Sequence, residues 1–211
     1  MIILINPNST VSMTEAMVRT ARDEVPSAQF DGWTSHQGPT SIQGREDGLL
    51  AEQPLLKLVA KASDQGASAI IIGCFDDTAL AAARNIANCP VIGIGQAAYH
   101  LAAIAGGRFS VVTTLDVSVP ILQENINTYG LTGQLSKVRA SGVPVLALEQ
   151  APSAAIKQVA AEIDKAALED GILSVVLGCG GMVGIEQKSA HSSEIRLIDG
   201  VRAAAVFASQ L

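Results

Sequence analysis

Short apolar runs alternate along this chain with longer segments in which apolar residues recur at helical spacing. The apolar runs are typical of buried strands, and we expect strands at residues 2–5, 69–72, 91–94, 110–113, 174–177 and 197–198. The helical spacing predicts helices at residues 12–25, 51–64, 78–86, 117–129, 154–169 and 201–209. Continuous apolar strands separated by helices indicate an α/β fold whose parallel sheet is covered on both faces.

The second half of the chain repeats the first at an offset of 105 residues. At that offset the segment 69–74, Ala-Ile-Ile-Ile-Gly-Cys, falls on the segment 174–179, Ser-Val-Val-Leu-Gly-Cys. The glycines and cysteines that coincide are Gly66 with Gly171, Gly73 with Gly178, Cys74 with Cys179, and Gly95 with Gly200. Since the offset is close to half of the 211 residues, we expect two small, related α/β halves that pack about a pseudo-twofold axis.

Two cysteines hold equivalent places in this repeat. Cys74 and Cys179 each follow a glycine at the carboxyl end of a predicted strand, where open α/β sheets bind their ligands. The repeat therefore predicts two thiols that face one pocket from opposite sides. A single free cysteine in such a place is more often a core residue, and Cys89, whose counterpart is Glu194, has no such partner and is taken as structural.

Two opposed thiols suit the inversion of a carbon that bears an acidic hydrogen. One group removes the proton from one face while the other delivers a proton to the opposite face, and identical groups can exchange these roles. A thiol has an ordinary pKa near ~8.5, and nearby dipoles lower it. Gly180 and Gly181 allow backbone amides to approach an enolate oxygen, whereas Asp76 and Asp77 would disfavour a thiolate at Cys74 if they point inward.

Composition excludes several other classes of function. The net charge is −6, the basic residues are scattered and aromatic residues make up 3%, which argues against binding to nucleic acid. No apolar run reaches 18 residues and the amino terminus lacks signal-peptide features, so we expect a cytoplasmic protein with no membrane span. The three cysteines are expected to be free thiols, and the three distant histidines predict no metal site.

Several motifs resemble those of the aspartate/glutamate/hydantoin racemase superfamily, and within it the hydantoin and allantoin racemases. The resemblance runs nearly end to end, and it is most specific in Asn-Pro-Asn-Ser-Thr at residues 6–10 and Gly-Cys-Phe-Asp-Asp at residues 73–77. Further matches lie at residues 38–42, 113–115, 118–120, 178–182 and 198–201. The resemblance implies two Rossmann-like halves with a shared cleft, for which we assign residues 1–97 plus 199–211 and residues 98–198. It also implies no cofactor and an acid/base pair formed by Cys74 and Cys179.

Carried over by position, the resemblance also implies a set of substrate-binding residues. Small polar side chains and backbone amides would hold the substrate, and apolar side chains would form the wall of the pocket. The polar set is Asn8, Ser9, Thr10, Thr113, Thr114, Gly180 and Gly181, and the wall is Ile42, Phe75 and Met182. Each has a structural alternative: residues 8–10 as the cap of the first helix, residues 113–114 as a strand end, and Phe75 and Met182 as core.

Three positions depart from the hydantoin racemases that the chain resembles. Gln43 and Gln96 stand where glutamate is usual, and Val117 stands where arginine is usual, which leaves the substrate open. The first hypothesis is a racemase of 5-substituted hydantoins or allantoin-like ureides, a small-molecule substrate in either case. The alternatives are a racemase of aspartate or glutamate, and a non-catalytic small-molecule binding protein. We also expect a homo-oligomer, although alanine-rich helices such as 78–86 and 201–209 suit packing within one chain as well.

Overall fold

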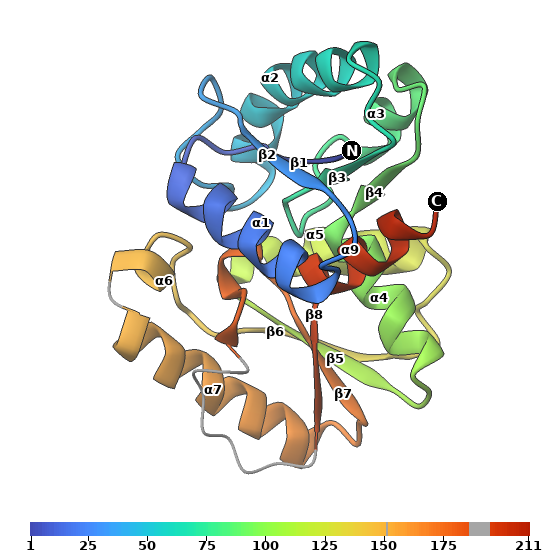
Figure 1. The fold of residues 1–211 in the computed structure, drawn as a ribbon. Coiled ribbons are helices and arrows are strands. Elements are labelled where there is room, and N and C mark those ends of the chain that lie inside the picture. Colours follow the sequence, from blue (N-terminus) through green and yellow to red (C-terminus); the bar gives the residue numbers. More distant parts are fainter. Residues whose placement is uncertain (151, 186–194) are drawn as a thin grey trace.

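Two four-stranded parallel sheets form the framework of the molecule (Figure 1). The computed structural model describes residues 1–150, 152–185 and 195–211. The first sheet and the helices that follow its strands comprise β1 (Ile2–Asn6), α1 (Val11–Glu24), β2 (Phe30–Thr34), α2 (Arg45–Asp64), β3 (Ala69–Ile72), α3 (Leu80–Ile86), β4 (Val91–Gly93) and α4 (Ile94–Ile104). The second series comprises β5 (Phe109–Thr113), η1 (Asp116–Ser118), α5 (Val119–Thr128), β6 (Leu135–Ala140), α6 (Ala147–Gln150), α7 (Pro152–Glu169), β7 (Ser174–Leu177), η2 (Gly180–Met182), β8 (Arg196–Asp199) and α9 (Gly200–Ser209).

The two sheets have the same strand order, which confirms the predicted pair of related α/β halves. The order is β2-β1-β3-β4 in the first sheet and β6-β5-β7-β8 in the second, and every strand pair is parallel. In each sheet every residue of the two central strands is buried, and most are apolar, because helices cover both faces. The carboxyl ends of the central strands of both sheets can therefore meet at one site.

Two helices cross from one half to the other and join the sheets. Helix α4 follows β4 of the first sheet but packs against β7 and β8 of the second, and α9 follows β8 but packs against α1 and β3 (Figure 1). The first turn of each helix lies against the backbone of another segment, Gly95 of α4 against Phe75 and Gly200 of α9 against Ile94. A Cβ on Gly200 would lie 2.6 Å from the carbonyl oxygen of Ile94, so only glycine permits this contact. This exchange makes α4 and α9 the centre of a shared core.

Two of the four edge strands, β2 and β6, were not predicted from the sequence. Strand β2 reads Phe-Asp-Gly-Trp-Thr and β6 reads Leu-Ser-Lys-Val-Arg-Ala, and neither has the continuous apolar run of a central strand because an edge strand is only partly covered. The predicted strand at 91–94 ends at Gly93, since Ile94 already begins α4. Helix α2 begins at Arg45, six residues before the predicted start, in a stretch whose helical pattern is broken by Gly48 and Pro54. In the part of the chain that the structure describes, no helix is long and apolar enough to cross a membrane.

Tyr99 offers a test of this core. Its side chain is fully buried between Phe75, whose ring centroid lies 5.4 Å away, and Phe109, at 6.3 Å. Its hydroxyl has no hydrogen-bond partner among the described residues, so the group pays for desolvation without a compensating bond. We expect Tyr99→Phe to raise the free energy of unfolding by about 1 kcal/mol and Phe109→Ala to lower it by about 3–5 kcal/mol. Urea denaturation measures both, and a marked loss of stability in Tyr99→Phe would contradict this packing.

Candidate active site

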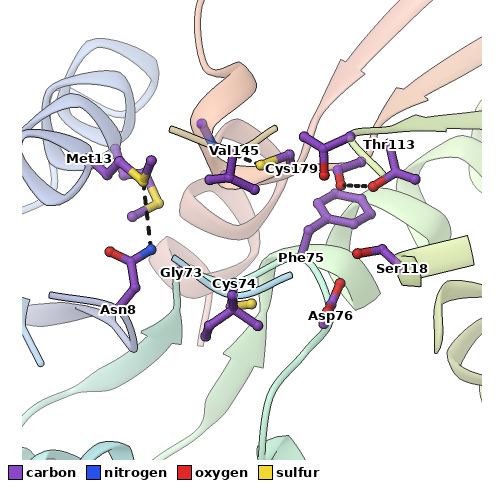
Figure 2. A pocket seen from close by; sticks show the side chains of 16 residues that line it. Asn8, Met13, Gly73, Cys74, Phe75, Asp76, Thr113, Ser118, Val145 and Cys179 are labelled. Atoms are coloured by element: carbon purple, nitrogen blue, oxygen red, sulfur yellow. Dashed lines mark hydrogen bonds between the residues drawn. The ribbon is translucent and has the colours of Figure 1, made fainter. Parts of the chain in front are cut away.

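A small pocket lies where the carboxyl ends of β1, β3, β5 and β7 converge (Figure 2). Its volume is about 30 Å³, room for only one or two water molecules, and the two cysteines on its walls are half-buried. Both halves contribute to the lining, which consists of Asn8, Met13, Met17, Ile42, Gly73, Cys74, Phe75, Asp76, Thr113, Thr114, Ser118, Val145, Gly178, Cys179, Gly180 and Gly181. The pocket is thus the place where the repeat brings its equivalent strand ends together.

Cys74 and Cys179 lie on opposite sides of this pocket (Figure 2). The backbone turns that carry them nearly touch, since a Cβ on Gly180 would lie 3.2 Å from the carbonyl oxygen of Gly73. The sulfur of Met17 fills the space beside both turns, at 3.0 Å from a Cβ on Gly73 and 3.2 Å from one on Gly180. Small residues beside each cysteine therefore allow the two thiols to share one site.

Each thiol accepts a hydrogen bond from a nearby residue. Thr78 Oγ1 donates to Cys74 Sγ at 3.3 Å, and the backbone N–H of Gly181 donates to Cys179 Sγ at 3.4 Å. Burial raises the pKa of Cys179 to about 12, and burial together with the charge of Asp76 raises the pKa of Cys74 still further. The two donors act in the opposite direction because a hydrogen bond to sulfur favours the thiolate. In the closed pocket both cysteines are therefore held as thiols near neutral pH.

The two aspartates that follow Cys74 point in different directions. Asp76 lines the pocket, and burial raises its pKa to about 7. Asp77 faces the start of α4, where its carboxylate accepts hydrogen bonds from the backbone N–H of Gly95 at 3.0 Å and Gln96 at 2.7 Å, and from Tyr129 Oη at 2.8 Å. Burial raises the pKa of Asp77 to about 7 as well, and these three donors oppose the rise. Of the two carboxyl groups, only that of Asp76 disfavours a thiolate from within the pocket.

Helix α5 of the second half holds this loop in place. Asn125 Nδ2 donates to the carbonyl oxygen of Asp76 at 2.8 Å, and Tyr129 bonds Asp77, whose φ of +49° lies in the left-handed region. A positive φ is costly for a residue other than glycine and persists where surrounding contacts fix it. The contacts from α5 and from Tyr129 just after it therefore fix the backbone of the loop that carries Asp76.

The structure brings most of the predicted binding residues to the pocket. Those that line it are Asn8, Ile42, Phe75, Thr113, Thr114, Gly180 and Gly181. Thr113 Oγ1 donates to the carbonyl oxygen of Gly178 at 2.8 Å, so its hydroxyl proton is engaged by the second cysteine turn. The Gly181 amide, expected to bind an enolate oxygen, donates to Cys179 Sγ instead.

Three predicted binding residues lie outside the lining. Ser9 Oγ donates to the carbonyl oxygen of Pro39 at 3.3 Å, and Thr10 Oγ1 donates to that of Thr40 at 2.7 Å. These contacts fix the loop before Ile42, and neither hydroxyl caps α1. Met182 is fully buried in the apolar cluster of the second half. These three residues therefore shape the pocket by holding its loops and core, and they do not line it.

Several lining residues were not singled out from the sequence. Met13 and Met17 stand four residues apart on the buried face of α1, a spacing that marks one face of a helix but not what that face contacts. Val145 lies in the loop after β6, and its backbone N–H donates to Gln43 Oε1 at 3.0 Å, a bond that links the two halves. Ser118 ends η1 and is buried. No pattern in the sequence predicts loop residues such as Val145.

The three departures from the hydantoin racemases all lie away from the pocket lining. Gln43 accepts the bond from Val145, a role that a glutamate could also fill. Gln96 is bonded by Arg84 near the start of α4, and Val117 is exposed beside Gly44. Within the described residues no group of three or more His, Cys, Asp or Glu side chains could hold a metal ion. Of the described side chains that line the pocket, none is Lys, Arg or His.

A pocket between two repeated α/β halves, with one cysteine from each, is the arrangement implied by the resemblance to the racemase superfamily. A family model described as Asp/Glu/hydantoin racemase matches residues 2–208, and the chain belongs to this family. It is 40% identical over 209 residues to a hydantoin racemase of Rhizobium meliloti, covering 99% of this chain and 87% of that protein. Its relatives make it a racemase, an isomerase by reaction class.

Solved structures of allantoin racemases have the same fold. The allantoin racemase from Klebsiella pneumoniae superposes with a TM-score of 0.95 at 36% identity, covering 100% of this chain and 86% of that one. The allantoin racemase from Pseudomonas fluorescens gives a TM-score of 0.93 at 34% identity, covering 100% and 89%. A glutamate racemase from Francisella tularensis, at 17% identity and a TM-score of 0.72 over 99% of this chain and 79% of that one, shares the fold alone.

The charge of Asp76 should control the reactivity of the thiols. The carboxyl loses its proton as the pH rises through about 7, so its charge raises the pKa of both cysteines above that pH and has no such effect well below it. We expect Asp76→Asn, made in a Cys89→Ser background, to speed alkylation by iodoacetamide roughly 10-fold at about pH 8. Peptide mass spectrometry assigns the label to Cys74 or Cys179. The exposed Asp116→Asn is the matched control, and equal rates in both variants would contradict this electrostatic role.

Proposed function

We propose that this protein racemises 5-substituted hydantoins or allantoin-like ureides by a two-base mechanism that uses Cys74 and Cys179. The observation that carries the proposal is the placement of both thiols on opposite sides of one pocket, at the ends of equivalent strands. The hydantoin and allantoin racemases among its relatives support this substrate class.

Racemisation follows from this arrangement in two proton transfers. The thiolate of one cysteine takes the proton from the stereocentre of the ring, and the electron pair left on carbon delocalises into the adjacent carbonyl group. The first cysteine reaches its thiolate form by giving its own proton to solvent before the transfer. The planar enolate then takes a proton on its other face from the thiol of the second cysteine, which becomes the thiolate. The two cysteines have exchanged protonation states, so the same pair is ready for the opposite enantiomer. The mechanism calls for no cofactor.

The narrow pocket is suited to this chemistry once a substrate occupies it. A thiol with its pKa raised by burial is a strong base when it does ionise, and excluding water prevents loss of the proton to solvent. Thr78 and the Gly181 amide each stabilise one thiolate, so both forms of the pair have a donor. Each half of the fold thus supplies a hydrogen-bond donor to its own cysteine.

The charges of the pocket favour a neutral ring over an amino acid. Its described lining carries one carboxyl group, Asp76, and no cationic side chain. An aspartate or glutamate substrate would bring carboxylates into a buried site with no cation to balance them, which is unfavourable. A hydantoin or ureide carries no charge, so this site holds it without such a partner.

Three further expectations remain proposals. Because α9 packs on the first half and α4 packs on the second, the contacts support a division into residues 1–97 plus 199–211 and residues 98–198. The free state of Cys74, Cys89 and Cys179 supports the cytoplasm as the location. A homo-oligomer is supported by the apolar residues exposed on α4 and α9, such as Ile104 and Val206.

Replacing the cysteines one at a time tests the mechanism. We expect Cys74→Ser and Cys179→Ser each to lose racemisation of a chiral hydantoin or allantoin by at least about 1,000-fold, because a serine hydroxyl is a far weaker acid and base at this position. In D2O each variant should still exchange the hydrogen at the stereocentre of one enantiomer only, as seen by NMR. Cys89→Ser should keep wild-type activity.

The outcomes separate the three functional hypotheses. Racemisation that survives either serine variant would overturn the two-base mechanism. Wild-type protein that turns over aspartate or glutamate but no hydantoin or allantoin would favour the amino-acid racemase. Binding of a ureide, measured by calorimetry, with retention of optical activity in every substrate would show a binding protein.

A further inference from the structure

One buried polar atom in the pocket has no partner. Asp76 is partly exposed as a residue, yet its Oδ2 is inaccessible to solvent and has no hydrogen-bond partner within residues 1–150, 152–185 and 195–211. Asp76 lines the same pocket as the two thiols (Figure 2). A buried carboxyl oxygen without a donor is unfavourable, and such atoms in native proteins call for an explanation.

The neighbours of Asp76 do not supply that donor. Its backbone is fixed by Asn125, and Asp77 turns away to bond Tyr129 and the start of α4. Thr113, which lines the same pocket, donates its hydroxyl proton to the carbonyl oxygen of Gly178. The backbone of Asp76 is therefore fixed by Asn125, while Oδ2 of its carboxyl group has no donor among the described residues. A ligand in the pocket could supply that donor.

We propose that Asp76 accepts a hydrogen bond from a ring N–H of the substrate and so selects cyclic ureides as substrates. The inference rests on the proposed function, because a hydantoin or allantoin ring carries N–H groups close to the stereocentre that the thiols must reach. The carboxyl group lines the same pocket as both thiols, so a hydrogen bond to it would orient the ring relative to them. Asp76 is then a specificity-determining residue in addition to the two bases.

The same contact accounts for an acidic group in a site that must form a thiolate. The charge of Asp76 raises the pKa of both cysteines, which opposes catalysis. A substrate N–H bonded to the carboxylate draws part of this charge away from the sulfurs, so the penalty is smallest when the correct substrate is bound. An amino acid could offer its ammonium group to Asp76, but its carboxylate would find no cation among the described lining residues.

N-methylated substrates test this hydrogen bond. The assay compares 5-benzylhydantoin with its 1-methyl and 3-methyl derivatives on the wild type, Asp76→Ala and Asp76→Asn. In the wild type we expect one of the two methylations to lower kcat/KM by about 10- to 100-fold, mainly through KM, because it removes a bond to a charged acceptor that is present before the chemical step. In Asp76→Ala the same methylation should lower kcat/KM by no more than about threefold, since the acceptor is gone.

The controls separate recognition from charge and from folding. Asp76→Asn keeps an acceptor oxygen without the charge, so its methylation penalty should fall between those of the wild type and Asp76→Ala, and it serves if Asp76→Ala does not fold. The exposed Asp116→Asn should keep the full penalty. A penalty as large in both Asp76 variants as in the wild type would overturn the inference, because it would reflect steric exclusion of the methyl group.

Failure of the proposed function would look different. In that case the wild type would racemise none of the three hydantoins and no allantoin. An active wild type with equal penalties in all variants would refute the role of Asp76 and leave the two-base racemase intact.

Discussion

The close approach of two glycine–cysteine turns is the constraint on which the site depends. Gly73 and Gly180 bring backbone from the two sheets nearly into contact, and a Cβ on Gly178 would lie 2.9 Å from Val111 and 3.0 Å from Thr113. A larger side chain at Gly180 would press on the Gly73 turn, whereas one at Gly73 or Gly178 would press on residues of its own half, and each change would displace a cysteine turn. The exchange of α4 and α9 between the halves makes this approach rigid, because each half is anchored by a helix from the other.

The surroundings of the two cysteines keep them in the unreactive thiol form. Burial holds both cysteines protonated, and the donors from Thr78 and Gly181 lower the energy of each thiolate without making it the resting form. In the absence of substrate, the charge of Asp76 makes ionisation of both thiols still less favourable. In the proposed mechanism the two thiols would therefore stay protonated until a neutral ring with N–H groups occupied the pocket, whereas a permanently ionised thiol would react with other compounds.

The repeat in the sequence predicts the fold and the main site because strand ends and glycines are set by local pattern. The equivalence of Cys74 and Cys179 was visible from their spacing, and both line the pocket. The edge strands β2 and β6 were missed because partial exposure removes the apolar run. The position of Asp76 could not be predicted from the sequence, since the loop that carries it is held by Asn125, a tertiary contact from α5. Ser9 was expected from its motif to bind the substrate, but its hydroxyl donates to the carbonyl oxygen of Pro39 in a neighbouring loop.

The measurement that tests the central claim most directly is a crystal structure of the Cys74→Ser/Cys179→Ser double variant with a 5-substituted hydantoin bound. The account predicts that the stereocentre lies between the two serine oxygens, with one oxygen on each face of the ring and each within contact distance of the carbon. A ring bound with both side chains on the same face, or with either of them out of reach of the stereocentre, would contradict it.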